Sequence, residues 1–419
     1  MIGQMDYLQR SVLLLCSFLF FTSQLQAQEN KISVRDALNL AFQNNPELNR
    51  AVEQIEIEKS YRGTALGIES PELYYFKEGI DGGLFSEQRW GVSQSIAFPL
   101  TGYYQRKKVS VNVDASRMQL RAVENSIRAT VKLAYTELAY AIKKIELINR
   151  EVDLAEELRQ TAEARLEAGE STELDLIQAE IQLTQSQNAL TEAEKLKNDA
   201  RYALFSVIGL NPDEQMYGIT YPDTLSYVEV EINQDDVMGR INQHPEILSG
   251  ELKVEGFERE VKAVKSEFLP SLRFDYYQQD FGNGYDFNGF EVGVSIPLWF
   301  GMNEGQKVQR ARAARSQAEW TLREKNLMIK EKAEKAWHGY EANRQKIESH
   351  LEVIESRSAT LLELTREGYR MGELDLLRLL EAQRTYLEGQ QMFYQTLKDY
   401  YVQLIELERY LPNEIVFTD

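Results

Sequence analysis

The sequence predicts a mainly α-helical protein that is built from two tandem copies of one unit and carries a membrane β-barrel portion. Three observations predict this fold class. Prolines recur at a spacing close to 199 residues, very long segments lack both glycine and proline, and two short regions alternate between apolar and small or polar residues. Repetition at a fixed period indicates how the rest of the chain divides.

Composition narrows the classes of function. The chain has 419 residues, 66 acidic against 47 basic side chains, and a formal net charge of −19. Nucleic-acid-binding domains normally carry a basic face, so this balance argues against a nucleic-acid partner. The single cysteine excludes a disulfide scaffold and a thiolate metal cluster.

The first segment has the features of an export signal. Residues 11–21 form an apolar run that is too short to span a bilayer but has the length of a signal-peptide core. We expect residues 1–27 to be removed by cleavage after Ala27. Three leucines precede Cys16, where a lipid-attachment cysteine needs a small residue, so acylation of Cys16 is the less favoured alternative. No later segment is apolar enough for a transmembrane helix.

The repeats set the domain organisation. Eight of the nine prolines pair at 198–200 residues, and the string ELDL at 173–176 recurs at 373–376. This pattern indicates a tandem duplication. The resulting divisions are a signal peptide (1–27), a first repeat (28–210), a linker or equatorial region (211–233), a second repeat (234–411) and a C-terminal tail (412–419).

Each repeat is expected to contain a helix, two strands, a long helix and a shorter helix. A short helix near 34–43 is followed by Asn45, which can cap the next helix, with Pro46 in its first turn. We expect that helix to continue to about Leu66. Segments 103–168 and 170–208 contain neither glycine nor proline, and 306–367 contains only Gly339.

The long helix of the first repeat is expected to pack against several neighbours. A helix of 66 residues is about 100 Å long, and apolar or small residues follow a heptad seam from Val131 to Ala155. The segments 45–66 and 172–208 are together long enough to pair along it.

Two regions, 71–98 and 270–300, are expected to form β-hairpins with one apolar face. Their strands are about 10–12 residues long, the length that a tilted barrel strand needs to cross a bilayer, and aromatic residues gather at the strand ends. A soluble sheet with one face on a core is the alternative. The residues predicted to face lipid are Trp90, Val92, Ile96, Phe98, Leu272, Phe274, Tyr276, Phe290, Val292, Val294, Ile296 and Leu298.

Four strands cannot close a membrane barrel. Open edges are not tolerated in lipid, where every backbone polar group needs a partner. Several chains must therefore share one barrel if the strands cross a membrane. Two copies would supply eight strands and three would supply twelve, and the residue pattern leaves both possibilities open.

The chain resembles TolC-family outer-membrane efflux proteins over essentially the whole region after the leader. The resemblance rests on ALNLAFQNNPEL (37–48), the two hairpins, the Pro-Leu pairs at 99–100 and 297–298, and the segments 165–180 and 369–383. It implies a homotrimer with a 12-stranded barrel in the outer membrane of a diderm bacterium and a long periplasmic α-helical tunnel. It also implies docking to a periplasmic adaptor (membrane fusion protein) and to an energised inner-membrane transporter of the RND type.

The segment 70–96 is similar to the heavy-metal branch of the family, the CzcC-like proteins, which implies heavy-metal cation efflux. Multidrug efflux and type I protein secretion are alternatives within the same fold, and a non-pore envelope scaffold of coiled coils is an alternative of another class. Only His244, His338 and His350 follow the leader, so no soft-metal site is evident.

The two turns between long helices are the functional candidates, because no phosphate loop, HExxH motif or nucleophile elbow is present. We therefore expect no enzymatic activity, no cofactor and no metal centre. Family resemblance implies that the turns form the periplasmic mouth where the adaptor docks. Acidic residues facing a threefold axis would form rings that favour cations, and two arginines could tie neighbouring tips together; ordinary helix capping is the alternative explanation. The aperture and docking candidates are Arg165, Gly169, Glu170, Ser171, Thr172, Glu173, Asp175, Arg370, Gly372, Glu373 and Asp375.

Overall fold

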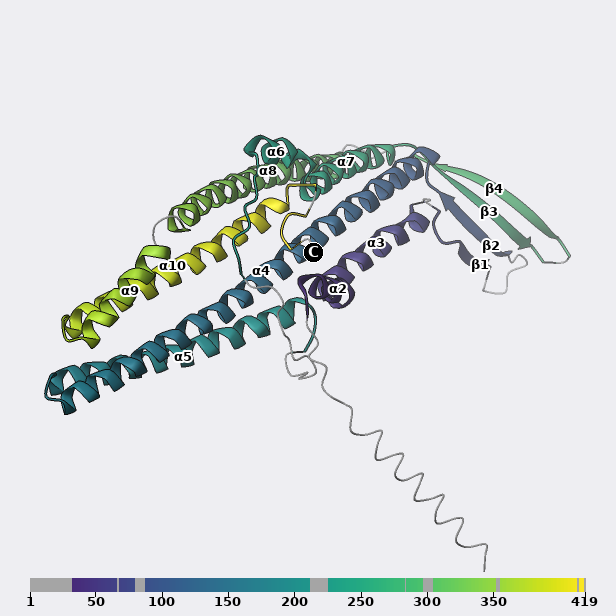
Figure 1. The fold of residues 1–419 in the computed structure, drawn as a ribbon. Helices are drawn as coiled ribbons and strands as arrows, with labels where there is room; N and C mark the ends of the chain where they lie inside the picture. Colours follow the sequence, from purple (N-terminus) through teal and green to yellow (C-terminus); the bar gives the residue numbers. More distant parts are fainter. Residues whose placement is uncertain are drawn as a thin grey trace, which may run out of the picture.

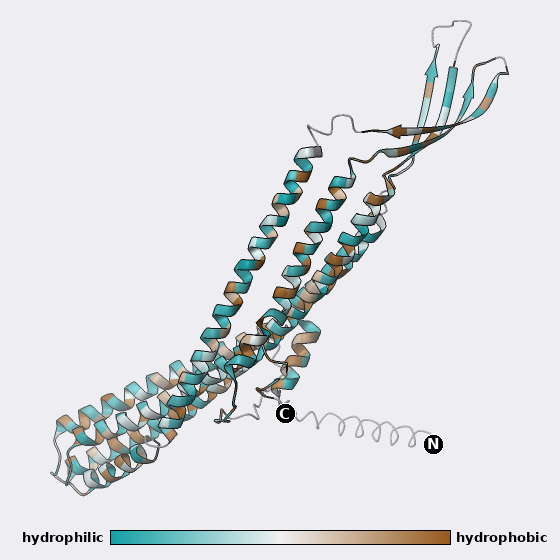
Figure 2. Ribbon diagram, turned by 90° about the horizontal axis from the view of Figure 1, so that it is seen from above, coloured by the Kyte–Doolittle hydropathy of each residue, from teal (hydrophilic) through white to brown (hydrophobic). Residues whose placement is uncertain are grey.

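The computed structural model describes residues 32–65, 68–79, 87–211, 225–282, 284–296, 304–351, 355–412 and 414–417. The predicted signal peptide, Cys16, Leu298 and the Pro-Leu pair at 297–298 lie outside these residues. The helices form a long bundle with a four-stranded sheet at one end (Figure 1). Apolar and polar stretches alternate along the helices (Figure 2), and none of the helices in the described ranges is long and apolar enough to cross a membrane.

The first half of the chain contains four helices and two strands within its described residues. They are α2 (Val34–Asn44), α3 (Pro46–Thr64), β1 (Glu72–Glu78), β2 (Glu87–Ile96), α4 (Pro99–Glu167) and α5 (Glu173–Val207).

The second half follows the same order with two differences. Its elements are α6 (Gln234–Arg240), η1 (Ile241–Gln243), α7 (Pro245–Ser266), β3 (Ser271–Asp280), β4 (Asp286–Ser295), α8 (Glu304–Ser349), α9 (Glu355–Arg370) and α10 (Leu376–Glu408). A 3-10 turn, η1, follows its first helix, and two helices, α8 and α9, stand in the place of α4.

Of the three described helices that begin with proline, α3 and α7 have a side-chain cap. The Asn45 side chain accepts a hydrogen bond from the Glu47 backbone N–H at 2.8 Å, which confirms Asn45 as the cap of α3. His244 takes the corresponding place before α7, where its Nδ1 accepts from the Glu246 N–H at 3.3 Å. Both side chains satisfy a backbone donor that has no partner inside the helix.

Helix α4 is the centre of the bundle. It packs against α3 and α5, as predicted, and also against α2, α7 and α10 (Figure 1). Val131, Leu138, Ala141 and Ile148 of the predicted seam are buried. The mixture of alanine with larger aliphatic residues allows helices to approach α4 from several sides.

The second long helix differs from the prediction, because 306–367 does not form one continuous helix. Helix α8 ends at Ser349, His350 and Leu351 are in a π turn, and α9 begins at Glu355. The segment contains no proline that would explain a break. The π turn coincides with the His350 ring stacking on Phe393 of α10, with 4.8 Å between the ring centroids.

The described part of the equatorial region runs as an extended strap over α8 and α10. Three tyrosine hydroxyls donate to alternate carbonyls of the strap: Tyr401 to Ser226 at 2.7 Å, Tyr400 to Val228 at 3.1 Å, and Tyr340 to Val230. All three rings are buried in the largest apolar cluster of the described residues. The strap therefore ties the linker to the second half of the bundle.

Candidate functional site

The first helix turn lies at the end of the bundle opposite the sheet. Gly169 follows α4 with a φ of +74°, a conformation that glycine adopts without a steric penalty. Thr172 caps α5, because its Oγ1 accepts from the Asp175 N–H at 3.3 Å and the Asp175 carboxylate accepts from the Thr172 N–H. This reciprocal pair makes Thr172, rather than Ser171, the cap of α5.

The second turn has the same length as the first, because five residues separate the helices in each, but its ELDL string begins three residues closer to the glycine. Gly372 has a φ of +76°, but the N–H groups of Glu373 and Leu374 both donate back to the Gly368 carbonyl, at 2.9 and 3.1 Å. This shift places Asp375 at the position that Thr172 occupies in the first turn, three residues after the glycine. Asp375 is consequently the cap of α10, whereas Asp175 lies inside α5.

Arg165 connects the two turns within one chain. Its Nη1 donates to the Tyr369 carbonyl at 2.8 Å, and its guanidinium lies 4.8 Å from the centroid of the Tyr369 ring. Burial raises the pKa of the Tyr369 hydroxyl. The sequence suggested a tie between neighbouring tips through Arg165 and Arg370. Here the contact is intramolecular, and Arg370 is exposed with no ion pair or hydrogen bond to another described residue.

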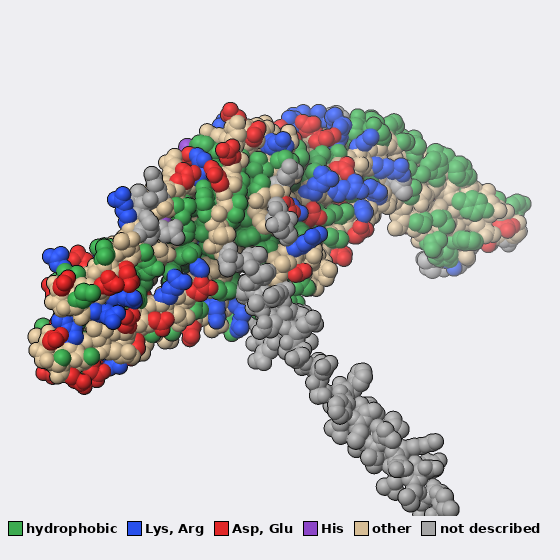
Figure 3. All heavy atoms as spheres, viewed as in Figure 1, with side chains coloured by type: hydrophobic (Ala, Val, Ile, Leu, Met, Phe, Trp, Pro, Cys, Tyr) green, Lys and Arg blue, Asp and Glu red, His purple; other side chains and the backbone are tan. Residues whose placement is uncertain are grey.

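The acidic candidates differ in their surroundings: the carboxylate of Asp175 is hydrogen-bonded, whereas Glu170, Glu173 and Glu373 are exposed. The Asp175 carboxylate accepts from the Ser171 hydroxyl at 2.6 Å, which is the main reason that its pKa lies below the usual range. Acidic side chains are visible at the end of the bundle away from the sheet (Figure 3). Their orientation toward a trimer axis stays a prediction.

The sheet collects the predicted apolar residues on one face. Its antiparallel order is β1-β2-β3-β4, and the register places Val92 opposite Tyr276 and Tyr276 opposite Phe290. The strand residues of the predicted set therefore share this apolar face. Phe98 lies beyond β2, where it precedes α4, and Ile296 follows β4. Members exposed on this face include Trp90, Tyr276, Phe290, Val292 and Val294.

The opposite face of the sheet, here called the polar face, carries charges that the sequence interpretation described only as small or polar positions. Arg89 donates to Gln279 Oε1 at 2.9 Å and also forms an ion pair with Glu87 at 3.5 Å. Nearer the helices, Arg273 lies 3.0 Å from Asp275 and 3.5 Å from Glu291. The alternation itself was the signal for these groups, because every one occupies the phase opposite to the apolar residues.

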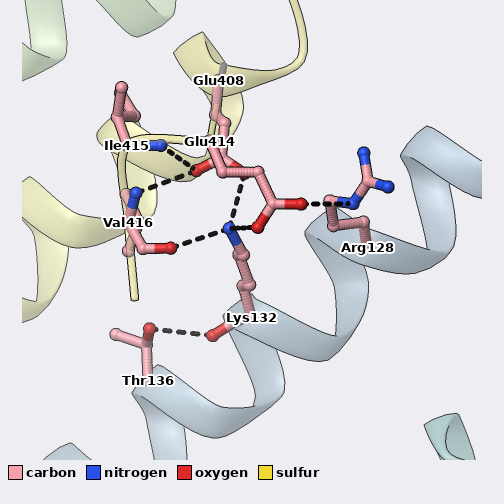
Figure 4. Close-up of polar contacts among 7 residues, drawn as sticks. All are labelled: Arg128, Lys132, Thr136, Glu408, Glu414, Ile415 and Val416. Atoms are coloured by element: carbon pink, nitrogen blue, oxygen red, sulfur yellow. Dashed lines mark hydrogen bonds and ion pairs between the residues drawn. The ribbon is translucent and has the colours of Figure 1, made fainter. Parts of the chain in front are cut away.

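No sequence pattern indicated the buried charge that lies at the middle of the bundle (Figure 4). Lys132 of α4 is fully buried, and its Nζ donates to Glu408 Oε1 at 2.6 Å and to the Val416 carbonyl at 2.7 Å. Glu414 adds a second carboxylate at 3.2 Å. These partners are more than 270 residues away in sequence, so no local pattern could reveal them.

The histidines serve local structure. His244 is a helix cap, His350 stacks on Phe393, and the exposed His338 is 4.0 Å from Glu334. Across the residues that the structure describes, no three His, Cys, Asp or Glu side chains lie close enough together to hold a metal ion.

The chain belongs to the outer membrane efflux protein family, whose model matches residues 88–210 and 240–413. Membership makes it an outer membrane protein of the efflux class rather than an enzyme, in agreement with the expectation from the sequence. The same match agrees with the TolC-family resemblance.

Two curated relatives and one solved structure illustrate the similarity. The outer membrane efflux protein BepC of Brucella suis is 26% identical over 295 residues, which are 67% of this chain and 63% of BepC. The pyoverdine export outer membrane protein OpmQ of Pseudomonas putida is 24% identical over 301 residues, 67% of this chain and 60% of OpmQ. The matched part thus spans less than two thirds of these relatives. The Campylobacter jejuni CmeC outer membrane channel shares the fold, with a TM-score of 0.78, 18% identity and coverage of 90% and 85% of the two chains.

Proposed function

We propose that the chain is one subunit of a homotrimeric outer-membrane duct, in which three copies supply a 12-stranded barrel and a periplasmic helical tunnel. The four-stranded sheet carries this proposal. It has one apolar face, and its outer strands β1 and β4 each pair with only one strand among the described residues. Lipid does not tolerate such open edges, and pairing β1 of one copy with β4 of the next removes them.

The helix turns support the position of the periplasmic mouth. They lie at the far end of the bundle from the sheet (Figure 1), which puts them deepest in the periplasm when the sheet is in the outer membrane. We propose that the adaptor docks here and that an inner-membrane transporter of the RND type supplies the energy. The exposed Glu173 and Glu373 then contribute rings of negative charge, which favour cations.

A planar-bilayer measurement tests this placement. The double variant Glu173→Gln/Glu373→Gln leaves both caps intact, because Thr172 and Asp375 supply them. We expect a lower preference for cations, measured as a shift of the reversal potential in a salt gradient. The pair Glu331→Gln/Glu388→Gln, on α8 and α10 away from the turns, is the matched control. A reversal potential that is equal in all three proteins contradicts an axial position for these carboxylates.

The domain division predicted from the prolines remains part of the proposal. The same order of elements in 28–210 and 234–411 supports a tandem duplication joined by 211–233. We also propose that residues 1–27 are an export signal, which an N-terminal sequence of the mature protein tests.

Two classes of cargo follow from different observations. The segment 70–96 supports heavy-metal cations, whereas the similarity to OpmQ supports export of a metal-chelating siderophore. A deletion strain separates them. Loss of metal resistance without a change in secreted chelator supports cations, and reduced extracellular chelator with normal metal resistance supports a siderophore. Full resistance and secretion, together with changed drug susceptibility, favour multidrug efflux.

A further inference from the structure

Tyrosines behave differently on the two faces of the sheet. On the apolar face, Tyr75 and Tyr276 stand out from the strands and are 63% and 54% exposed. On the polar face, Tyr74 and Tyr277 belong to the same two strands but are half-buried. The neighbours of each ring on the polar face explain this difference.

Each half-buried tyrosine lies opposite a glycine on the next strand. The register pairs Tyr74 with Gly91 and Tyr277 with Gly289. A Cβ at Gly289 would overlap the ring of Tyr277, so that ring occupies the space above the glycine. A Cβ at Gly91 would come within 2.8 Å of the Tyr74 hydroxyl oxygen. Both hairpins thus use a strand glycine to let an aromatic ring lie across the sheet.

Arg89 holds the ring of Tyr277 in this position. Its guanidinium carbon lies 4.5 Å from the ring centroid, within the range of a cation–π interaction. The guanidinium is itself anchored by Gln279 and Glu87. The Tyr277 ring therefore lies between the backbone at Gly289, which has no side chain, and the hydrogen-bonded guanidinium of Arg89.

We propose that these tyrosine–glycine pairs set the free width of the barrel lumen, and with it the size of solute that passes the membrane portion of the duct. The inference rests on the proposed function, because the polar face lines a lumen only when copies of the sheet close into a barrel. A ring that stood up as Tyr276 does would project into that lumen. Lying across glycine, the two rings of each subunit leave the lumen wider.

Size-graded labelling in whole cells tests the proposal. S295C places a thiol at the helix end of β4 on the polar face, so a probe that enters from outside the cell passes the level of Gly289 before it reaches this thiol. Maleimide-linked neutral polymers of increasing length are added to intact cells. Protein without S295C gives the background, which includes any labelling of Cys16.

Gly289→Ala should push the Tyr277 ring into the lumen and shift the cut-off for labelling to shorter polymers. Tyr277→Ala should shift it to longer polymers, and the double variant should recover at least the wild-type cut-off. Gly293→Ala is the matched control on the same strand and face, because the nearest atom to its Cβ would be Arg273 Nε at 3.5 Å. Its cut-off should equal that of the wild type.

An unchanged cut-off in both Gly289→Ala and Tyr277→Ala overturns the proposal. When Gly289→Ala fails to assemble, Tyr277→Ala decides: a longer cut-off supports the role of the ring, and an unchanged one overturns it. Failure of the proposed function, in which the polar face lines a lumen, gives another result. In that case, S295C of the otherwise unaltered protein is not labelled even by the smallest maleimide that cannot cross a lipid bilayer.

Discussion

At the scale of single residues, Lys132 shows how a charge is kept inside the bundle. Its ammonium group is buried with the Glu408 carboxylate, whose side chain is only 8% exposed, and Glu408 also accepts from the N–H groups of Ile415 and Val416. Each charge is compensated and hydrogen-bonded, as burial requires. The cluster fastens the last described residues of the chain to α4.

Lys132→Met should therefore destabilise the protein severely, by about 3–5 kcal/mol, because it leaves Glu408 buried without its cation. Resistance of the purified protein to denaturant measures the effect. Lys132→Met/Glu408→Gln should recover part of the loss, since the unpaired charge is gone. Equal loss in the single and double variants would show that the charge pair is not the cause.

His244 predicts a pH dependence of stability. Burial lowers its pKa, with Arg409 and Lys325 acting in the same direction against Glu246, and its Nδ1 must be unprotonated to cap α7. Because the unfolded chain binds the proton first, the stabilisation is complete above a pH of about 6.5. It is lost as the pH falls below that value, with a slope of at most about 1.4 kcal/mol per pH unit.

His244→Asn provides the test, because Asn45 already performs the same capping role before α3. The thermal unfolding midpoint of this variant should depend less on pH between 7.5 and 5.5 than that of the wild type. His338→Asn, which replaces an exposed histidine, is the control and should retain the wild-type dependence. An unaltered slope in His244→Asn would exclude His244 as the source.

At the scale of elements, Arg165 holds the α4–α5 turn against the end of α9. Arg165→Ala removes a hydrogen bond from a charged donor, a contact of about 1.5–3 kcal/mol, together with the stacking on Tyr369. The two helix pairs should separate more readily at the tip. We expect higher single-channel conductance and faster cleavage at the turns by a glutamate-specific protease, whose sites this variant and its control both retain.

Arg370→Ala is the matched control for Arg165→Ala, because Arg370 is a neighbouring exposed arginine that makes no such contact in the described structure. Its conductance should stay near that of the wild type. Equal effects of the two variants would mean that the charge of the tip, rather than the Arg165–Tyr369 contact, controls the opening.

At the scale of the whole molecule, the proposal that the apolar face of the sheet contacts lipid predicts how the protein tolerates a charge on that face. Val292 lies near the middle of β4 and is 54% exposed on that face. An arginine near the bilayer midplane costs about 2–4 kcal/mol on the lipid side of a barrel. Val292→Arg should therefore reduce the amount of the proposed trimer recovered from outer membranes.

Ser295→Arg places the same side chain on the polar face of the same strand and should be tolerated. Membrane fractionation followed by gel electrophoresis of unheated samples measures both variants. Normal assembly of Val292→Arg would indicate that this face does not contact lipid.

Local sequence patterns determined the elements themselves. Asn45-Pro46 defined where α3 starts, the absence of glycine and proline predicted the length of α4, and period-two alternation separated Val92 and Tyr276 from the polar face. These features could be predicted because hydrogen bonding, capping and side-chain direction depend on residues a few positions apart.

The tertiary structure alone decided which distant residues meet. It brought Lys132 to Glu408, directed Arg165 to Tyr369 of its own chain, and stacked His350 on Phe393 where the second long helix divides. It also laid Tyr277 across Gly289. Such contacts depend on how helices and strands pack in three dimensions, and a one-dimensional pattern carries no information about the partner that burial will supply.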